Sequence, residues 1–282
     1  QVHRIDFYRL DMQTRFPFRY GIASMSEVPH LFVQMQIEID NEMWQGTSSE
    51  GLPPKWFTKN PETDFNTDEL PVMLTVIKQA ADFAIMGQTH PSFFSWWMDL
   101  YQQQAAWSQE NEIPPLLANL GVSLMERAAL DATCRPQQSS LSTVLHQNRL
   151  GIDLSAIRPD LTGLEPSDVL PPKPLRHVQL RHTVGLGDPL TESDIKADKR
   201  LDDNLPHSLA SNIDRYGLRY FKIKLSGDLK SDLVRMRMLS ALLHDHVGET
   251  MRFTLDGNEQ YSTMAEFREH WLALYADPSI RR

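Results

Sequence analysis

The sequence predicts an α+β domain over residues 1–174 and an α/β domain over residues 175–282. Residues 30–40 alternate strictly between apolar and polar side chains, which is typical of an antiparallel strand with one solvated face. The proline-rich residues 171–174 predict a linker. After it, strand and helix patterns alternate, which indicates a parallel sheet with right-handed crossovers.

The first domain is predicted to begin with strands over residues 2–12, 30–40 and 43–49, the last two joined by a turn at Asp40-Asn41. Three helices are expected to follow. The first begins at a capping pair of Asn66 and Glu69, with an apolar stripe behind it. Residues 91–109 and 116–134 form the other two. The stripe of the first helix comprises Leu70, Leu74, Ile77 and Ala81.

The second domain is predicted to contain strands over residues 177–184, 220–225 and 251–255, each followed by a helix. Asp228 is expected to cap the second helix. Thr263 and Glu266 form a capping box for the third. That third helix bears Met264, Phe267, Trp271 and Leu274. Three such units are compatible with an open doubly wound sheet or with the first part of a (β/α)8 barrel.

Composition excludes several classes of protein. The chain is 41% apolar and 23% charged, with a formal net charge of −9, so nucleic acid and anionic membranes are poor partners. No apolar run approaches the ~18 residues of a membrane span. The one cysteine, Cys134, cannot form an internal disulfide, which fits a reducing compartment. A cytoplasmic protein is therefore expected, and a homo-oligomer stays open.

Two lysines, Lys222 and Lys224, stand two residues apart on the second predicted strand. Alternate side chains of a strand share a face, so both ammonium groups should point the same way. Mutual repulsion and partial burial would lower a lysine pKa and so produce a usable general base. The alternative is a solvent-facing pair on an edge strand, where lysine is common.

The next predicted strand ends in Asp256-Gly257-Asn258. Asp-Gly is also a hairpin signal, but a capped helix follows, which favours a strand-to-helix loop. Asp256 would then lie at the carboxyl end of a parallel strand, where an oxygen ligand can bind a hard cation such as Mg²⁺. One carboxylate does not hold Mg²⁺ alone, and the residues that follow this segment in the sequence offer no further oxygen ligand in the correct place.

The order and spacing of these segments resemble the mandelate racemase/muconate lactonizing branch of the enolase superfamily. The resemblance extends over nearly the whole chain. Its matching segments are residues 17–21, 46–53 and 126–132, the Lys-x-Lys of residues 222–224, and the Asp-x-Asn of residues 256–258. The resemblance implies an α+β capping domain followed by the first three βα units of a modified (β/α)8 barrel.

The same resemblance implies roles for single residues. Lys224 would be the proton-abstracting base, and Lys222 the neighbour that lowers its pKa. Asp256 would be the first Mg²⁺ ligand, and Asn258 a polar neighbour in the site. Residues of the capping segments would contact a small-molecule carboxylate substrate: Arg19, Tyr20, Lys55 and Trp56. Arg19 or Lys55 could bind a second acidic group, although an ordinary surface role is equally compatible with each of these residues.

The implied chemistry is Mg²⁺-dependent abstraction of a proton α to a carboxylate, through an enediolate. It would give racemisation or epimerisation, dehydration, or cycloisomerisation, so the enzyme would be an isomerase or a lyase. The further metal ligands and the opposite-face acid or base lie on later strands in that family. The sequence reaches Arg282 after three βα units, so an inactive fragment or a non-catalytic α/β binding protein stays open. Three βα units are not expected to close by themselves, so either further chain supplies the missing strands, or unpaired outer strands make the isolated chain poorly soluble.

Overall fold

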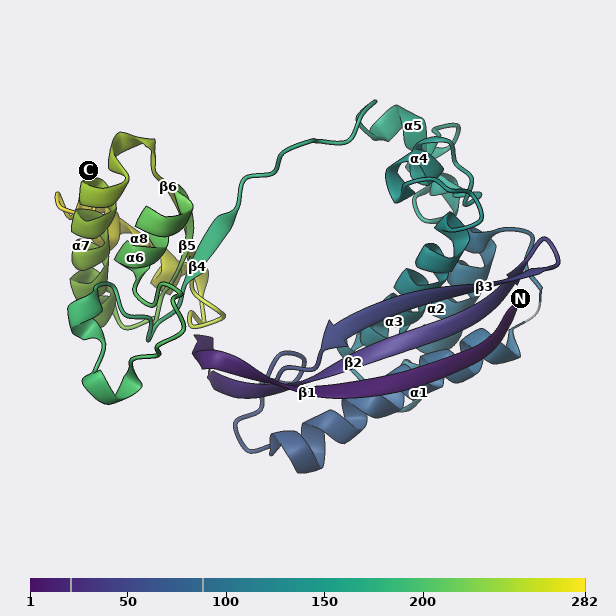
Figure 1. Ribbon diagram of the computed structural model, residues 1–282, viewed down its shortest axis with the longest axis horizontal. Helices are drawn as coiled ribbons and strands as arrows, with labels where there is room; N and C mark the ends of the chain where they lie inside the picture. The colour runs from purple at the N-terminus through teal and green to yellow at the C-terminus, as the bar shows by residue number, and fades with distance from the viewer. Residues whose placement is uncertain (21, 88, 282) are drawn as a thin grey trace. The chain divides into compact units, whose positions relative to one another are not determined.

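The computed structural model describes residues 1–20, 22–87 and 89–281, so Gly21 of the segment 17–21 lies outside the described residues. The chain divides into two compact units (Figure 1). The first contains Gln1–Arg15 and Met25–Arg176, and the second contains Phe16–Ser24 and His177–Arg282. The sequence predicts one boundary, after residue 174, and no pattern in it indicates that Phe16–Ser24 groups with the second unit.

A three-stranded sheet in the order β1-β2-β3 begins the chain, formed by β1 (Val2–Tyr20), β2 (Ala23–Ile39) and β3 (Glu42–Gly51). Strands β2 and β3 pair antiparallel, as predicted. Asp40 and Asn41 turn between them with φ of 53° and 65°. Positive φ at both central residues is the geometry of a tight two-residue hairpin, and Asn and Asp tolerate it best.

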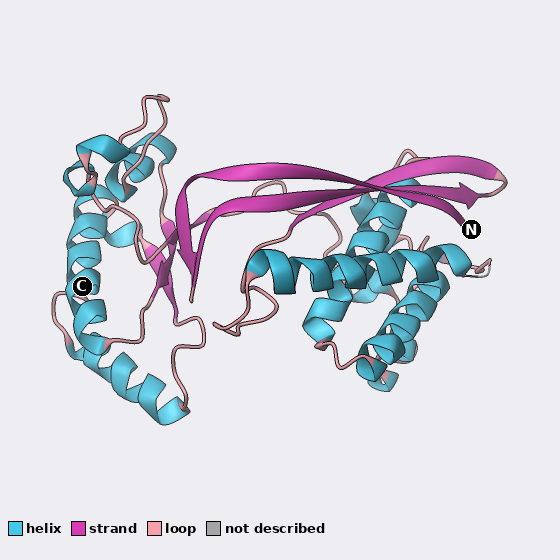
Figure 2. Cartoon of the chain, turned by 90° about the horizontal axis from the view of Figure 1, so that it is seen from below, coloured by secondary structure: helices cyan, strands magenta, loops and turns pink. Residues whose placement is uncertain are grey.

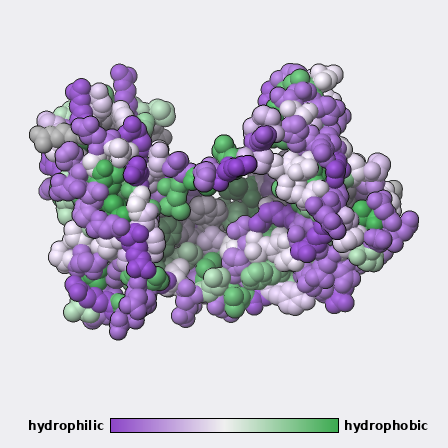
Figure 3. Space-filling model, turned by 45° about the horizontal axis from the view of Figure 1, so that its top comes forward, coloured by the Kyte–Doolittle hydropathy of each residue, from purple (hydrophilic) through white to green (hydrophobic). Residues whose placement is uncertain are grey.

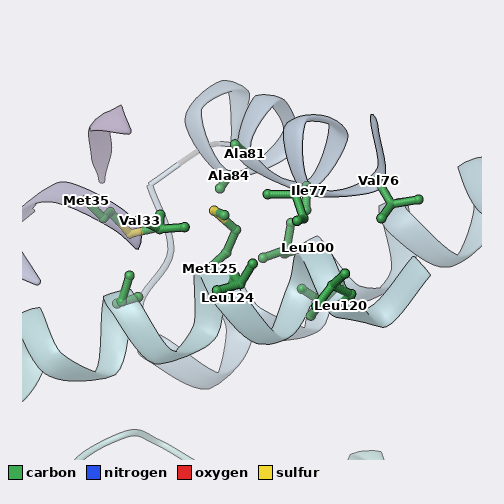
Figure 4. Packing of buried hydrophobic residues seen from close by; sticks show 14 of the residues in the cluster. Val33, Met35, Val76, Ile77, Ala81, Ala84, Leu100, Leu120, Leu124 and Met125 are labelled. Atoms are coloured by element: carbon green, nitrogen blue, oxygen red, sulfur yellow. The ribbon is translucent and has the colours of Figure 1, made fainter. Parts of the chain in front are cut away.

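Helices α1 (Leu70–Met86), α2 (Phe93–Glu110) and α3 (Pro115–Cys134) cover one face of this sheet (Figure 2). The inward side chains of β2 pack against them, as the alternation predicted (Figure 4). Gly46 of β3 allows the closest approach, because a Cβ there would lie 2.0 Å from the Ala128 carbonyl oxygen of α3. A larger residue at position 46 would push the helix off the sheet.

The start of α1 differs from the prediction. Asp64 caps the turn that precedes it, and accepts hydrogen bonds from the N–H groups of Asn66 and Thr67. Residues Phe65–Glu69 form a π-helical turn, and Glu69 turns inward. The predicted stripe is wrong at Leu74, which is 38% exposed. The buried face instead includes Met73, Val76 and Ala80.

Short elements lead to the second unit. Helices α4 (Leu141–His146) and α5 (Pro166–Val169) end the first unit. Residues 171–180 form neither helix nor strand, as expected of a linker. The strand predicted over residues 177–184 is therefore shorter, because only β4 (Arg181–Val184) pairs with a neighbour.

The second unit contains a three-stranded parallel sheet in the order β4-β5-β6, with β5 (Tyr220–Lys224) between β4 and β6 (Arg252–Asp256). Helices α6 (Leu209–Tyr216), α7 (Leu229–His246) and α8 (Met264–Ala276) alternate with these strands. The predicted α+β then α/β order is confirmed. Parallel pairing of β5 with β6 is confirmed as well.

The predicted helix starts in this unit are confirmed at Asp228 and at the Thr263–Glu266 capping box. Helix α6 ends at Gly217, which has φ of 61°. The apolar residues of α8 do not all face inward. Met264 and Trp271 are 77% and 45% exposed, whereas His270 and Leu274 are the buried residues of this helix.

Hydrophilic residues dominate the face of the molecule seen in Figure 3. Across residues 1–20, 22–87 and 89–281, none of the helices combines the length and the apolar character that crossing a bilayer requires.

Candidate active site

Lys222 and Lys224 both reach the carboxylate of Asp256. The Nζ atoms of Lys222 and Lys224 lie 2.6 Å and 2.8 Å from Asp256 Oδ2. Lys224 donates a hydrogen bond to that oxygen. The alternative of a solvent-facing pair on an edge strand is wrong, because β5 pairs with a strand on both sides.

Strand periodicity and register bring these groups together. Phe221, Ile223 and Leu225 are 0%, 1% and 3% exposed in the core of the second unit. With the odd-numbered side chains buried among the helices, the even-numbered lysines must occupy the opposite face. The parallel register then places Lys224 beside Asp256.

The cluster carries more positive than negative charge, since two ammonium groups share one carboxylate. The Lys224 side chain is 6% exposed and that of Lys222 is 33% exposed. Burial opposes ionisation of Asp256, but hydrogen bonds from Lys222, Lys224 and the Asn258 N–H outweigh it. The pKa of Asp256 therefore lies well below its usual range.

The loop after β6 closes onto the same carboxylate. The backbone N–H of Asn258 donates to Asp256 Oδ1 over 3.0 Å. Asn258 itself has φ of 46°, a conformation that asparagine adopts more easily than most residues. Since α8 follows this loop, the hairpin alternative for Asp256-Gly257 is wrong.

Two threonines flank Lys222, and sequence reasoning missed them. The register pairs Lys222 with Thr183 of β4 and with Thr254 of β6, so all three side chains share a face. Arg181 Nη1 donates to Thr254 Oγ1 over 3.2 Å. The period-two rule could have found Thr254, which stands two residues before Asp256.

Arg19 and Tyr20 belong to the second unit. Arg19 is exposed, and its Cδ lies 3.3 Å from the place where a Cβ on Gly187 would be. Gly187 follows the carboxyl end of β4, and Lys224 and Asp256 end β5 and β6. Carboxyl ends of parallel strands meet at one edge of a sheet, so Arg19 lies at that edge. Tyr20 is only 6% exposed, and its ring packs against Phe18.

Lys55 and Trp56 lie in the first unit. Trp56 is 49% exposed. The Lys55 ammonium forms an ion pair with Glu69 Oε1 and donates to Asn60 O over 2.9 Å and to Thr63 Oγ1 over 2.8 Å. An ammonium group has three donors, and these partners use them. The expectation that Lys55 offers a cation to a substrate does not fit this geometry.

The residues present supply only part of a metal site. Asp256 offers a carboxylate at a strand end, which suits Mg²⁺. However, both of its oxygens accept hydrogen bonds from within the protein. Over the described ranges 1–20, 22–87 and 89–281, no three His, Cys, Asp or Glu residues gather as a metal would require. The described residues therefore give one ligand and not a complete Mg²⁺ site.

Comparisons by sequence find no matching family model and no matching curated protein. Comparison with solved structures finds similar folds. A mandelate racemase/muconate lactonizing protein from Herpetosiphon aurantiacus superposes with a TM-score of 0.59 at 16% identity, over 98% of this chain and 57% of its own. A dipeptide epimerase from Enterococcus faecalis, complexed with Mg and a dipeptide, gives 0.57 at 15% identity, over 97% and 58%.

A third structure, an enolase from Bradyrhizobium complexed with magnesium and mandelic acid, gives a TM-score of 0.56 at 16% identity, over 95% of this chain and 56% of its own. The chain thus spans less than two thirds of the length of each of these proteins. At such low identity, the likeness establishes the fold. This chain has the fold of mandelate racemase/muconate lactonizing proteins of the enolase superfamily, as the sequence analysis expected.

Proposed function

We propose that this protein removes the proton α to the carboxylate of a small molecule, and that Lys224 is the base. The observation that carries the proposal is the Lys222–Asp256–Lys224 cluster at the carboxyl ends of two parallel strands. Enzymes built on parallel barrel strands hold their reacting groups at this end. The fold of the similar structures, among them an epimerase, supports the same class of reaction.

Lys224 is the better base of the two lysines because its side chain is 6% exposed, against 33% for Lys222. Lys222 lies beside the base and shares the Asp256 carboxylate with it, and Asn258 holds that carboxylate through its backbone N–H.

A divalent cation would stabilise the negative charge that a carboxylate substrate gains on losing its α-proton. Asp256 would provide one of its oxygen ligands, as Mg²⁺ prefers. The other ligands are not among the residues described here. Two of the similar structures are complexed with Mg, which supports Mg²⁺ as the ion.

Arg19 is the residue best placed to bind a second acidic group of the substrate, because its guanidinium lies near the carboxyl end of β4. Tyr20, next to Arg19 in the sequence, is buried and packs against Phe18. Depending on where the removed proton returns or which group leaves, the net reaction is racemisation or epimerisation, dehydration or cycloisomerisation.

Exchange of the substrate α-proton with D2O tests the proposal. The full-length protein with Mg²⁺ is incubated with mandelate and with a panel of dipeptides, and exchange is followed by NMR. We expect exchange with at least one of these carboxylates, and loss of exchange from one face in Lys224→Ala. Full exchange in Lys224→Ala would place the base elsewhere. Binding of carboxylates without exchange in the unmodified protein would favour a non-catalytic binding protein.

A further inference from the structure

The second unit contains a buried contact between Asp232 of α7 and His270 of α8. Their side chains are 3% and 6% exposed, and His270 Nε2 lies 3.1 Å from Asp232 Oδ2. Buried charged and polar groups are costly unless they are satisfied. Neither residue belongs to the proposed chemistry, and neither was anticipated from the sequence.

Asp232 holds the loop that follows Lys224. Its Oδ1 accepts hydrogen bonds from the N–H and the hydroxyl of Ser226, both over 2.9 Å. Its Oδ2 accepts from the N–H of Gly227 over 3.1 Å. Ser226 stands two residues after Lys224, so the carboxylate fixes the backbone at the point where the base leaves its strand.

On the other side, His270 reaches the loop that follows Asp256. The ring of Tyr261 meets the His270 ring edge-on, with centroids 5.2 Å apart. Tyr261 in turn lies against Gly257, where a Cβ would come within 2.5 Å of Tyr261 Cε2. Gly257 directly follows Asp256, so His270 is linked to the residue next to the carboxylate through one aromatic ring.

The two loops also touch each other. A Cβ on Gly227 would lie 2.8 Å from Gln260 Cβ, and Gly227 has φ of 82°. Glycine is needed there both for the close approach and for the backbone conformation. The Asp232–His270 contact thus lies behind two loops that are packed together, one continuing from Lys224 and the other from Asp256.

We infer that Asp232 and His270 are positioning residues, which hold these loops so that Lys224 and Asp256 keep their 2.8 Å contact. The inference rests on the proposed function for its catalytic consequence. A displacement of about 1 Å at a reacting group can lower a rate by about a hundredfold, so loss of the buried contact should reach the chemistry through the loops.

The test uses the full-length protein with three substitutions. His270→Leu removes the nitrogen that lies 3.1 Å from Asp232 Oδ2, and His270→Gln keeps a polar group near the same place. The control is Arg237→Gln. Arg237 of α7 forms an ion pair with Asp277, just after the end of α8, over 2.7 Å. That pair joins α7 to the residues that follow α8, and Asp277 also accepts hydrogen bonds from Ser279.

Amide hydrogen exchange at Ser226 and Gly227 is the first measurement, and it does not depend on any activity. In His270→Leu, we expect the hydrogens of these amides to exchange about tenfold faster, because the loop opens locally more often. In His270→Gln, the exchange rates of these amides should stay near those of the unmodified protein. In Arg237→Gln, they should not change. Equal exchange in His270→Leu and Arg237→Gln would overturn the positioning role.

The second measurement is the rate of substrate α-proton exchange. His270→Leu should lower kcat about tenfold with KM within about twofold, as expected when orientation rather than binding is lost. His270→Gln should recover most of kcat, and a low kcat in this variant would contradict the inference. This comparison still decides the question if His270→Leu does not fold. If the unmodified protein exchanges no substrate proton, the proposed function fails, and the amide measurement alone decides the positioning role.

Discussion

Two lysine–carboxylate clusters, one in each unit, use the same chemical groups in opposite ways. In the first unit, Lys55 meets Glu69, which is 4% exposed, and the Lys55 ammonium also donates to Asn60 and Thr63. In the second unit, two ammonium groups share Asp256, whose side chain is 22% exposed. The first cluster is neutral and saturated, and the second carries excess positive charge.

The difference separates a structural ion pair from a candidate site. Lys55 is held within one loop and has φ of 55°. Its pairing with Glu69 closes residues 55–69 into a fixed segment. Lys222 and Lys224, by contrast, meet at the ends of strands, where an anionic substrate would find unbalanced positive charge. Charge balance and donor saturation, rather than the presence of a lysine near a carboxylate, indicate which cluster can do chemistry.

The largest expected effect on stability comes from Glu69. Glu69→Gln leaves the Lys55 ammonium without its charged partner in a largely buried place, and should lower the free energy of unfolding by about 3 kcal/mol. Urea unfolding followed by tryptophan fluorescence measures this. Tryptophans 44, 56, 96, 97 and 107 lie in the first unit, and only Trp271 lies in the second.

The matched control for Glu69 is Asp82→Asn. It breaks the Lys78–Asp82 pair, whose side chains are 74% and 42% exposed. An exposed pair of this kind contributes about 0.5 kcal/mol or less. A loss for Glu69→Gln no larger than for Asp82→Asn would remove the distinction between a buried structural pair and a surface pair.

A smaller effect is expected on Mg²⁺ binding to the full-length protein. Asp256→Asn should weaken binding about tenfold, because the ion loses an anionic oxygen ligand. Lys222→Met should have the opposite sign and tighten binding, since it removes a positive charge beside that ligand. Isothermal titration measures both, and an unchanged affinity in Asp256→Asn would exclude Asp256 from the metal site.

The smallest effect is the acid dependence of the first unit. Burial opposes ionisation of Glu69, but hydrogen bonds from Lys55 and Thr63 outweigh it and lower the pKa of Glu69. The unfolded chain therefore binds the proton more readily. Ionised Glu69 stabilises the fold above the unfolded pKa of about 4.3, and this contribution is lost as pH falls through the lower folded pKa.

Unfolding midpoints measured from about pH 6 to about pH 3 should accordingly fall less steeply in Glu69→Gln than in the unmodified chain. Asp82→Asn should keep the steeper slope. Parallel slopes in Glu69→Gln and the unmodified chain would mean that the Lys55–Glu69 pair does not couple folding to pH.

Local sequence patterns predicted the features that depend on neighbouring residues in the chain. Alternation identified β2, the same-face spacing placed Lys222 and Lys224 together, and capping residues marked the starts of α7 and α8. The pattern also predicted the parallel strands, whose register then places Asp256 beside Lys224. The main elements of the candidate site could therefore be read from the sequence.

Contacts between distant segments could not be read in this way. Nothing near Lys55 indicates that Glu69 will turn inward to meet it, since a glutamate three residues after Asn66 matches a capping box equally well. His270 is buried because Asp232, from another helix, lies opposite. Trp271 is the more apolar of the two neighbours, yet it is 45% exposed, whereas His270, which lies against Asp232, is buried.

The comparison of the two clusters is tested most directly by the rate of substrate α-proton exchange in Lys224→Met and Lys55→Met of the full-length protein. Lys224→Met should lose exchange by about a thousandfold, as when a general base is removed, while remaining folded. Lys55→Met should be less stable, yet keep exchange within about threefold per folded molecule, because orientation at the β5 end is unchanged. Exchange that survives in Lys224→Met, or that vanishes in folded Lys55→Met, would contradict the assignment of the two clusters.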